Sequence, residues 1–98
     1  MIKGVCHGDR TLCEAKVAHA LFWYLSQRGP LAAAVAAGQA GAPDLLREAQ
    51  NFARDTARQV VAFQKSGVLA VDVDGVKAEI VWTVHDVTGG ADWEIRPK

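Results

Sequence analysis

The chain has 98 residues, of which 50% are hydrophobic and 22% are charged, as in an ordinary globular domain. Eleven basic and eleven acidic residues give a formal net charge of zero, so net charge does not favour bulk nucleic acid or an anionic membrane as a partner. No apolar run approaches the roughly 20 residues of a membrane span. We therefore expect one soluble, cytoplasmic domain over residues 1–98, without membrane association.

The first segment, residues 1–10, is compatible with either a short strand or a tail. The chain has two cysteines, Cys6 and Cys13, which are too few for a disulfide scaffold. With His7 and His19 they form a ligand set that zinc accepts. However, adjacent Cys6 and His7 rarely serve one metal, and Cys13 and His19 point apart by roughly 120° on a helix. We expect no metal and no cofactor.

A first helix is predicted from Thr11 to about Arg28. Thr11 and Glu14 have the spacing of a capping box, which places the helix start at Thr11. Gly29 suits a left-handed position after the last turn, and Pro30 cannot continue the helix. The predicted buried face of this helix comprises Cys13, Val17, Leu21, Tyr24 and Leu25.

A second apolar face of the same helix is predicted to be an interface. It carries Leu12, Phe22 and Trp23 beside His19. Aromatic residues are enriched at interface centres, so we expect a homodimer or another protein partner at this face. Burial of a neutral His19 there would make protonation oppose association. The competing interpretation is that a short helix over residues 31–37 covers Trp23 within the monomer.

A long amphipathic helix is predicted to follow the alanine-rich short helix 31–37. Pro43 suits the first position of this helix, and the negative charge of Asp44 suits its N-terminus, which is the positive end of the helix dipole. It runs to about Lys65, with Gly67 as its stop. Its predicted apolar stripe comprises Leu45, Ala49, Phe52, Ala53, Thr56, Val60 and Phe63.

Four cations follow one line on the opposite face of the long helix, namely Arg47, Arg54, Arg58 and Lys65. A row of cations can follow the phosphates of a nucleic acid. Glu48 and Asp55 sit close beside the row and offset its charge, so a solvated face is the favoured interpretation. Nucleic-acid binding through this basic row stays as the alternative function.

Two turns predict a three-stranded antiparallel meander over residues 67–97. Asp74-Gly75 is a strong hairpin signal, and it pairs Val73 with Val76, Val71 with Ala78 and Leu69 with Ile80. At Gly89-Gly90 the same logic pairs Val84 with Ile95, His85 with Glu94 and Thr83 with Arg96. The two turns agree on which face of the sheet is buried.

No catalytic constellation is apparent. The predicted pair of His85 and Glu94 lacks a nucleophile in a recognisable elbow, although Thr83 shares its strand face. The chain also lacks a glycine motif for phosphate binding. These observations predict that the protein is not an enzyme.

The expected fold is therefore α+β, with the helical part 11–66 packed on one face of the meander 67–97. The expected function is that of a small non-enzymatic interaction or structural protein that self-associates. The reason for this expectation is apolar surface that the core does not need. It is predicted on the first helix and on the open face of the sheet, at Val68, Ala70, Val81 and Val87.

Overall fold

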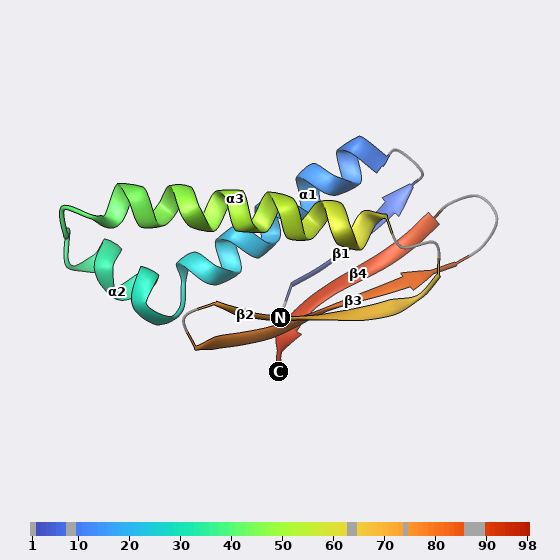
Figure 1. Ribbon diagram of the computed structural model, residues 1–98. Coiled ribbons are helices and arrows are strands. Elements are labelled where there is room, and N and C mark those ends of the chain that lie inside the picture. The colour runs from blue at the N-terminus through green and yellow to red at the C-terminus, as the bar shows by residue number, and fades with distance from the viewer. Residues whose placement is uncertain (1, 8–9, 63–64, 74, 86–89) are drawn as a thin grey trace.

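A computed structural model describes residues 2–7, 10–62, 65–73, 75–85 and 90–98. The fold is α+β: a four-stranded antiparallel sheet in the order β1-β4-β3-β2 carries the helices on one face (Figure 1). The elements are β1 (Ile2–His7), α1 (Arg10–Ser26), α2 (Gly29–Ala36), α3 (Ala42–Val61), β2 (Gly67–Val73), β3 (Val76–Val84) and β4 (Gly90–Pro97). None of these helices is long and apolar enough to cross a lipid bilayer in the part of the chain that the structure describes.

The N-terminal segment is a strand, so the prediction of a three-stranded sheet was wrong by one strand. β1 pairs antiparallel with β4, from Ile2 opposite Ile95 to His7 opposite Gly90. Gly4 lies opposite Trp93, and a Cβ at Gly4 would come within 2.5 Å of the Trp93 ring. Gly4 thus leaves room for the indole, and it also obscured the alternating pattern by which a strand is recognised.

The first predicted hairpin is confirmed, with its register. Val73 pairs with Val76, and Leu69 pairs with Ile80. Gly75 has a φ of 85°, and its N–H donates to Asp72 Oδ1 at 3.2 Å. The predicted turn residue Asp74 lies outside the described residues. Because positive φ is easily adopted only by a few residue types, the turn could be located from sequence.

The second hairpin was predicted in the wrong register. Val84 pairs with Ala91 instead of Ile95, a shift of four residues, and Thr83 pairs with Asp92 instead of Arg96. An even shift keeps the same side chains on the buried face, which is why the predicted face is still correct. The buried pair of Trp82 and Trp93 belongs to this register. Residues 86–89, between the strands, lie outside the described part of the chain.

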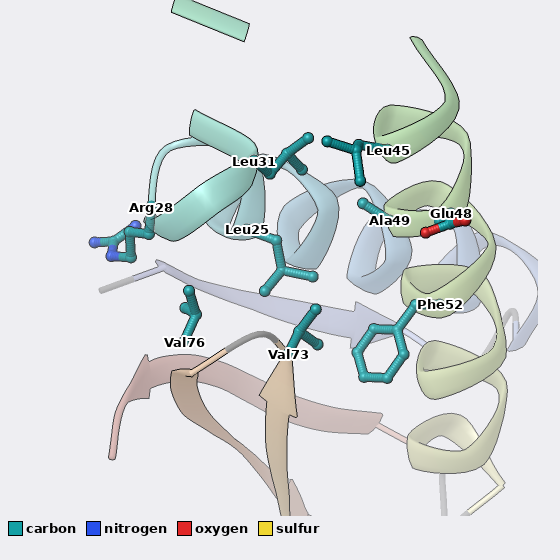
Figure 2. A pocket seen from close by; sticks show the side chains of 9 residues that line it. All are labelled: Leu25, Arg28, Leu31, Leu45, Glu48, Ala49, Phe52, Val73 and Val76. Carbon is teal, nitrogen blue, oxygen red and sulfur yellow. The ribbon is translucent and has the colours of Figure 1, made fainter. Parts of the chain in front are cut away.

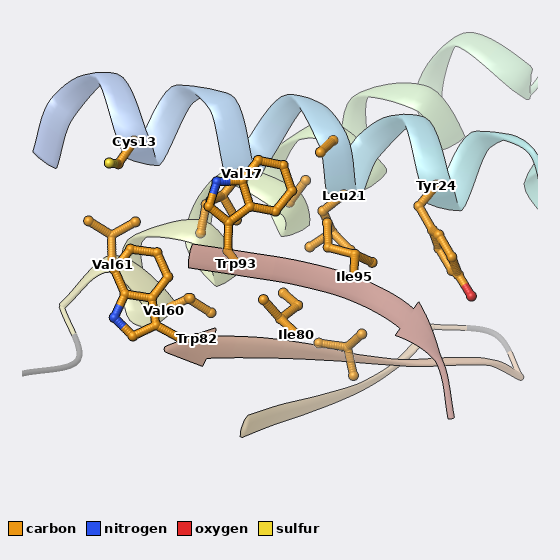
Figure 3. Close-up of a cluster of buried hydrophobic side chains, with 14 of the residues drawn as sticks. Cys13, Val17, Leu21, Tyr24, Val60, Val61, Ile80, Trp82, Trp93 and Ile95 are labelled. Carbon is orange, nitrogen blue, oxygen red and sulfur yellow. The ribbon is translucent and has the colours of Figure 1, made fainter. Parts of the chain in front are cut away.

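The core lies between the sheet and the two longer helices, which run antiparallel beside each other (Figures 1 and 3). The predicted inner face of α1 is confirmed, and Val17 and Leu21 are fully buried. Val60 of α3 is also fully buried, whereas Phe52 is only partly buried against the core, and Phe63 lies outside the described residues. The largest fully buried side chains are Trp82, Tyr24, Leu21, Ile80, Ile95, Val17 and Val60.

The helix ends differ from the predictions by a few residues, and α2 spans Gly29–Ala36 instead of residues 31–37. α1 begins at Arg10, so Thr11 lies inside its first turn and not at the predicted cap. α3 ends at Val61, four residues before Lys65. Gly29 has a φ of 68°, as the predicted turn after α1 requires, and a Cβ there would overlap Val76 Cγ2. Glycine is therefore needed at this position for both its backbone and its lack of a side chain.

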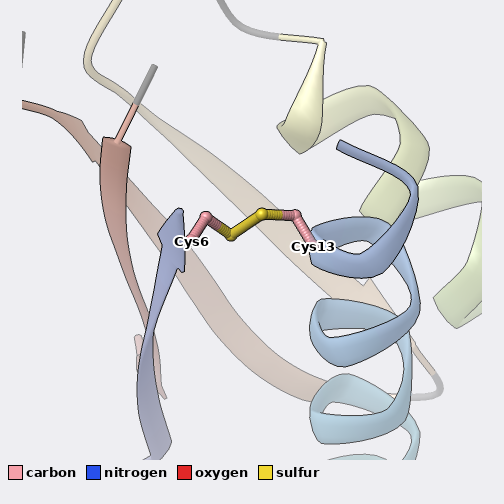
Figure 4. Close-up of a disulfide and its surroundings, with 2 residues drawn as sticks. All are labelled: Cys6 and Cys13. Carbon is pink, nitrogen blue, oxygen red and sulfur yellow. A yellow bond between two sulfur atoms is a disulfide. The ribbon is translucent and has the colours of Figure 1, made fainter. Parts of the chain in front are cut away.

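A disulfide between Cys6 and Cys13 joins β1 to the first turns of α1 (Figure 4). The two Cα atoms are 5.5 Å apart, and each cysteine is 3% exposed. The two cysteines are thus too few for a disulfide-rich fold, but they form one covalent link between the edge strand β1 and the helix α1.

Candidate functional site

The strongest candidate for a functional surface is the outward face of α1. Leu12 is 52% exposed and Trp23 is 51% exposed, and Ala15 and His19 between them are also exposed. We call these four residues the α1 outer stripe. Their spacing of three or four residues places them on one line, which is about 16 Å long at 1.5 Å per residue. The chain thus presents the apolar side chains of Leu12, Ala15 and Trp23 to solvent on one helix face, with His19 and Lys16 between Leu12 and Trp23.

Two details of the predicted interface change in the structure. Phe22 is partly buried and packs against the core, so it does not belong to the exposed face with Leu12, His19 and Trp23. In addition, α2 leaves half of the Trp23 side chain in solvent, so the short helix does not provide the cover that the competing interpretation required. The surface is narrower than predicted, but its aromatic residue is exposed.

The α1 outer stripe carries little charge. Lys16 is exposed between Ala15 and His19, and it is the only formally charged residue beside the stripe between Leu12 and Trp23 on this helix face. Glu14 lies on the side of α1 that faces α3, where its Oε1 is 3.5 Å from Nε of Arg58. The carboxylate of α1 therefore interacts within the monomer.

Three of the four cations of the predicted basic row, Arg47, Arg54 and Arg58, lie exposed on α3, and Lys65 does not belong to this helix. Arg47 is 3.9 Å from an oxygen of Asp44, and Arg58 interacts with Glu14 and, at 3.9 Å, with Asp55. Lys65 lies beyond the end of α3, so only Arg54 keeps its predicted place without a carboxylate partner among the described residues. The row is not a continuous cationic stripe along one helix.

The outer face of the sheet carries ion pairs other than those predicted. His85 Nε2 lies 2.9 Å from Asp92 Oδ2, and not beside Glu94, because the register is shifted. Arg96 Nε lies 2.7 Å from Glu79 Oε1. Within the described part of the chain, no hydroxyl or thiol is hydrogen-bonded to the His85 imidazole. The arrangement is that of cross-strand pairs on a half-exposed sheet face.

No group of three or more His, Cys, Asp or Glu side chains converges on a point among the residues described. The sulfur atoms of Cys6 and Cys13, which were considered as zinc ligands from the sequence, are bonded to each other. A thiolate is what a zinc ion needs from cysteine, so the oxidised pair is not available as a ligand set.

An apolar hollow of about 310 Å³ lies between the three helices and the tip of the β2–β3 hairpin (Figure 2). We call it the helix–hairpin hollow; its lining residues are Leu25, Arg28, Leu31, Leu45, Glu48, Ala49, Phe52, Val73 and Val76. The guanidinium of Arg28 lies over the Tyr24 ring, 3.8 Å from its centroid, and Arg28 Nη1 donates to the Tyr24 carbonyl at 3.3 Å. Sequence reasoning missed this hollow because five separate segments bring its residues together.

No protein-family model, no curated protein and no solved structure matches this chain. Its function is therefore inferred from its own residues. The α1 outer stripe and the helix–hairpin hollow both offer apolar surface to solvent, and exposed Val5 and Val68 on the sheet and Val35 on α2 are further apolar side chains in solvent.

Proposed function

We propose that the protein is a non-enzymatic interaction protein and that two copies associate through the α1 outer stripe. The observation that supports this proposal is the exposure of Trp23. About half of this residue lies in solvent, in line with Leu12, while the opposite face of the same helix is buried. A tryptophan held in solvent exposes a large apolar area, and tryptophan is among the residues enriched at the energetic centres of interfaces. The fold does not need Trp23, because the other face of α1 already docks the helix.

A second copy is a suitable partner because the stripe is self-complementary. Two α1 helices packed antiparallel about a twofold axis near the middle of the stripe would place Leu12 against Trp23 of the partner subunit. The small Ala15 side chain permits close approach of the two helices. Lys16 would lie near His19 of the partner subunit, so the two Lys16 side chains are kept apart.

Sedimentation or light scattering over a range of protein concentrations tests the dimer. We expect the mass of a dimer at about 10 to 100 µM, and a shift toward monomer in the variant Trp23→Ser. Arg54→Ser on α3 is the matched control, since it also removes an exposed long side chain, and it should leave the mass unchanged. A monomeric mass for the unmodified protein up to about 100 µM would rule out this proposal.

Nucleic-acid binding through the basic row is the alternative function. The interactions of Arg47 with Asp44 and of Arg58 with Glu14 offset two of the four cations, so we expect no tight binding. Titration with generic DNA and RNA at two salt concentrations tests this. A salt-sensitive affinity in the micromolar range or tighter, weakened by Arg54→Gln, would favour the alternative.

The disulfide bears on the cellular location. Disulfides persist in oxidising compartments and are rare in the cytosol. We therefore propose that the protein resides in an oxidising compartment, in place of the cytoplasmic location expected from the sequence. Alkylation of the protein at the moment of cell lysis, followed by mass determination, tests this: Cys6 and Cys13 should be protected, and two alkylated thiols would contradict it.

A further inference from the structure

We propose that the helix–hairpin hollow binds a small molecule that has an apolar body and a carboxylate, with the carboxylate at Arg28. This inference is independent of the α1 outer stripe, because Leu25, the residue of α1 that lines the hollow, is not one of the four stripe residues (Figure 2). It assigns a ligand class to the site: a short aliphatic or aromatic carboxylic acid.

The apolar part of the proposal follows from the walls of the hollow. Leu25, Phe52 and Val73 turn toward one another from α1, α3 and the hairpin, and Leu31 and Leu45 close the space from above in Figure 2. A volume of about 310 Å³ lies at the lower end of the range of small-molecule pockets. Phe52 is only partly buried although it sits on the otherwise buried stripe of α3, so its ring has an unfilled side for a ligand to cover.

The charged part follows from Arg28. Its guanidinium is held in place by the Tyr24 ring and the Tyr24 carbonyl, but no carboxylate interacts with it among the described residues. A half-buried guanidinium in a fixed orientation binds a carboxylate with a small entropic cost, because little side-chain freedom remains to be lost.

The carboxylate of Glu48, the second charged group at the hollow, determines which way round the ligand would bind. In Figure 2, Glu48 and Arg28 lie on opposite sides of the apolar side chains. Glu48 is exposed, so its carboxylate is solvated and repels an anion from that side. Arg28 lies at the edge of the hollow, and its side chain extends away from Leu25 and Phe52 in Figure 2. A ligand with one carboxylate is therefore expected to place its charged end at this edge, beside Arg28, and its apolar end toward Phe52.

Calorimetric titration with hexanoate, octanoate and decanoate, each below its micelle concentration, tests the proposal. We expect one site per chain and a dissociation constant that falls about fourfold for each added methylene until the hollow is full. Decanol should bind about tenfold more weakly than decanoate, since it lacks the charged group. Decylamine, which has the opposite charge, should bind more weakly still.

Variants separate the two parts of the site. Arg28→Gln should lower decanoate affinity to the level of decanol and leave decanol binding unchanged, whereas Arg28→Lys should keep part of the preference for the acid. Arg47→Gln, which removes an exposed cation outside the hollow, is the matched control and should change nothing. Ala49→Leu places a larger side chain in the hollow and should abolish binding of both molecules. Equal affinities for acid, alcohol and amine, or binding unaffected by Ala49→Leu in a folded variant, would overturn the proposal.

Discussion

α1 and α3 lie in the same layer and cover the same face of the sheet, yet their outward faces differ. The outward face of α3 is polar and carries exposed arginines such as Arg54, while the outward face of α1 carries exposed Leu12 and Trp23. A helix in this layer needs only one buried face, as α3 demonstrates. The second apolar face of α1 is therefore not explained by folding, and this is the basis for assigning an interaction surface to α1.

The largest expected effect concerns the inner faces, where the two helices should also differ. Leu21→Ala in α1 removes a fully buried side chain and should lower the free energy of unfolding by about 3 kcal/mol. Phe52→Ala in α3 should cost about 1 to 2 kcal/mol, because the ring is only partly buried. Chemical denaturation measures both. A larger loss for Phe52 than for Leu21 would mean that α3, and not α1, holds the centre of the core.

The disulfide should stabilise α1 more than α3. Reduction, or the double variant Cys6→Ala with Cys13→Ala, should lower the free energy of unfolding by about 2 kcal/mol, as expected for a short closed loop. Hydrogen exchange should show faster opening in the first turns of α1, with the exchange of α3 less affected. Uniform acceleration of both helices would show that the bond acts only on global stability.

The outward faces should matter little for the stability of the monomer. Trp23→Ser and Arg54→Ser, measured at a concentration where the protein is monomeric, should each change the free energy of unfolding by less than about 0.5 kcal/mol. A loss above about 2 kcal/mol for Trp23→Ser would show that this residue belongs to the core, and the contrast between α1 and α3 would disappear.

The smallest expected effect is in the link between the two helices. Arg58 and Glu14 are 3.5 Å apart, but their side chains are 64% and 32% exposed, so solvent screens the pair. A double-mutant cycle with Arg58→Gln and Glu14→Gln should give a coupling free energy of about 0.5 kcal/mol or less, and it should decrease in high salt. A coupling well above 1 kcal/mol would mean that the two helices are joined by this pair as well as by packing.

The sequence by itself determined the features that depend on local conformation. Gly75 and Gly29, which both adopt a positive φ in the structure, located a hairpin and a helix end. The side-chain periodicity of α1 identified its buried face, which includes Val17 and Leu21. Short-range rules suffice there, because neighbouring residues and backbone sterics decide these conformations.

Only the tertiary structure decided the features that join distant parts of the chain. The pairing of β1 with β4 connects residues about 90 positions apart, and Gly4 had weakened the strand pattern of β1. The register of β4 was decided across the sheet, where Trp82 meets Trp93, and not by the glycine pair at residues 89–90. The helix–hairpin hollow likewise exists only after five segments have packed. Such contacts cannot be predicted from neighbouring residues alone, because their free energy arises from burial between elements that are remote in sequence.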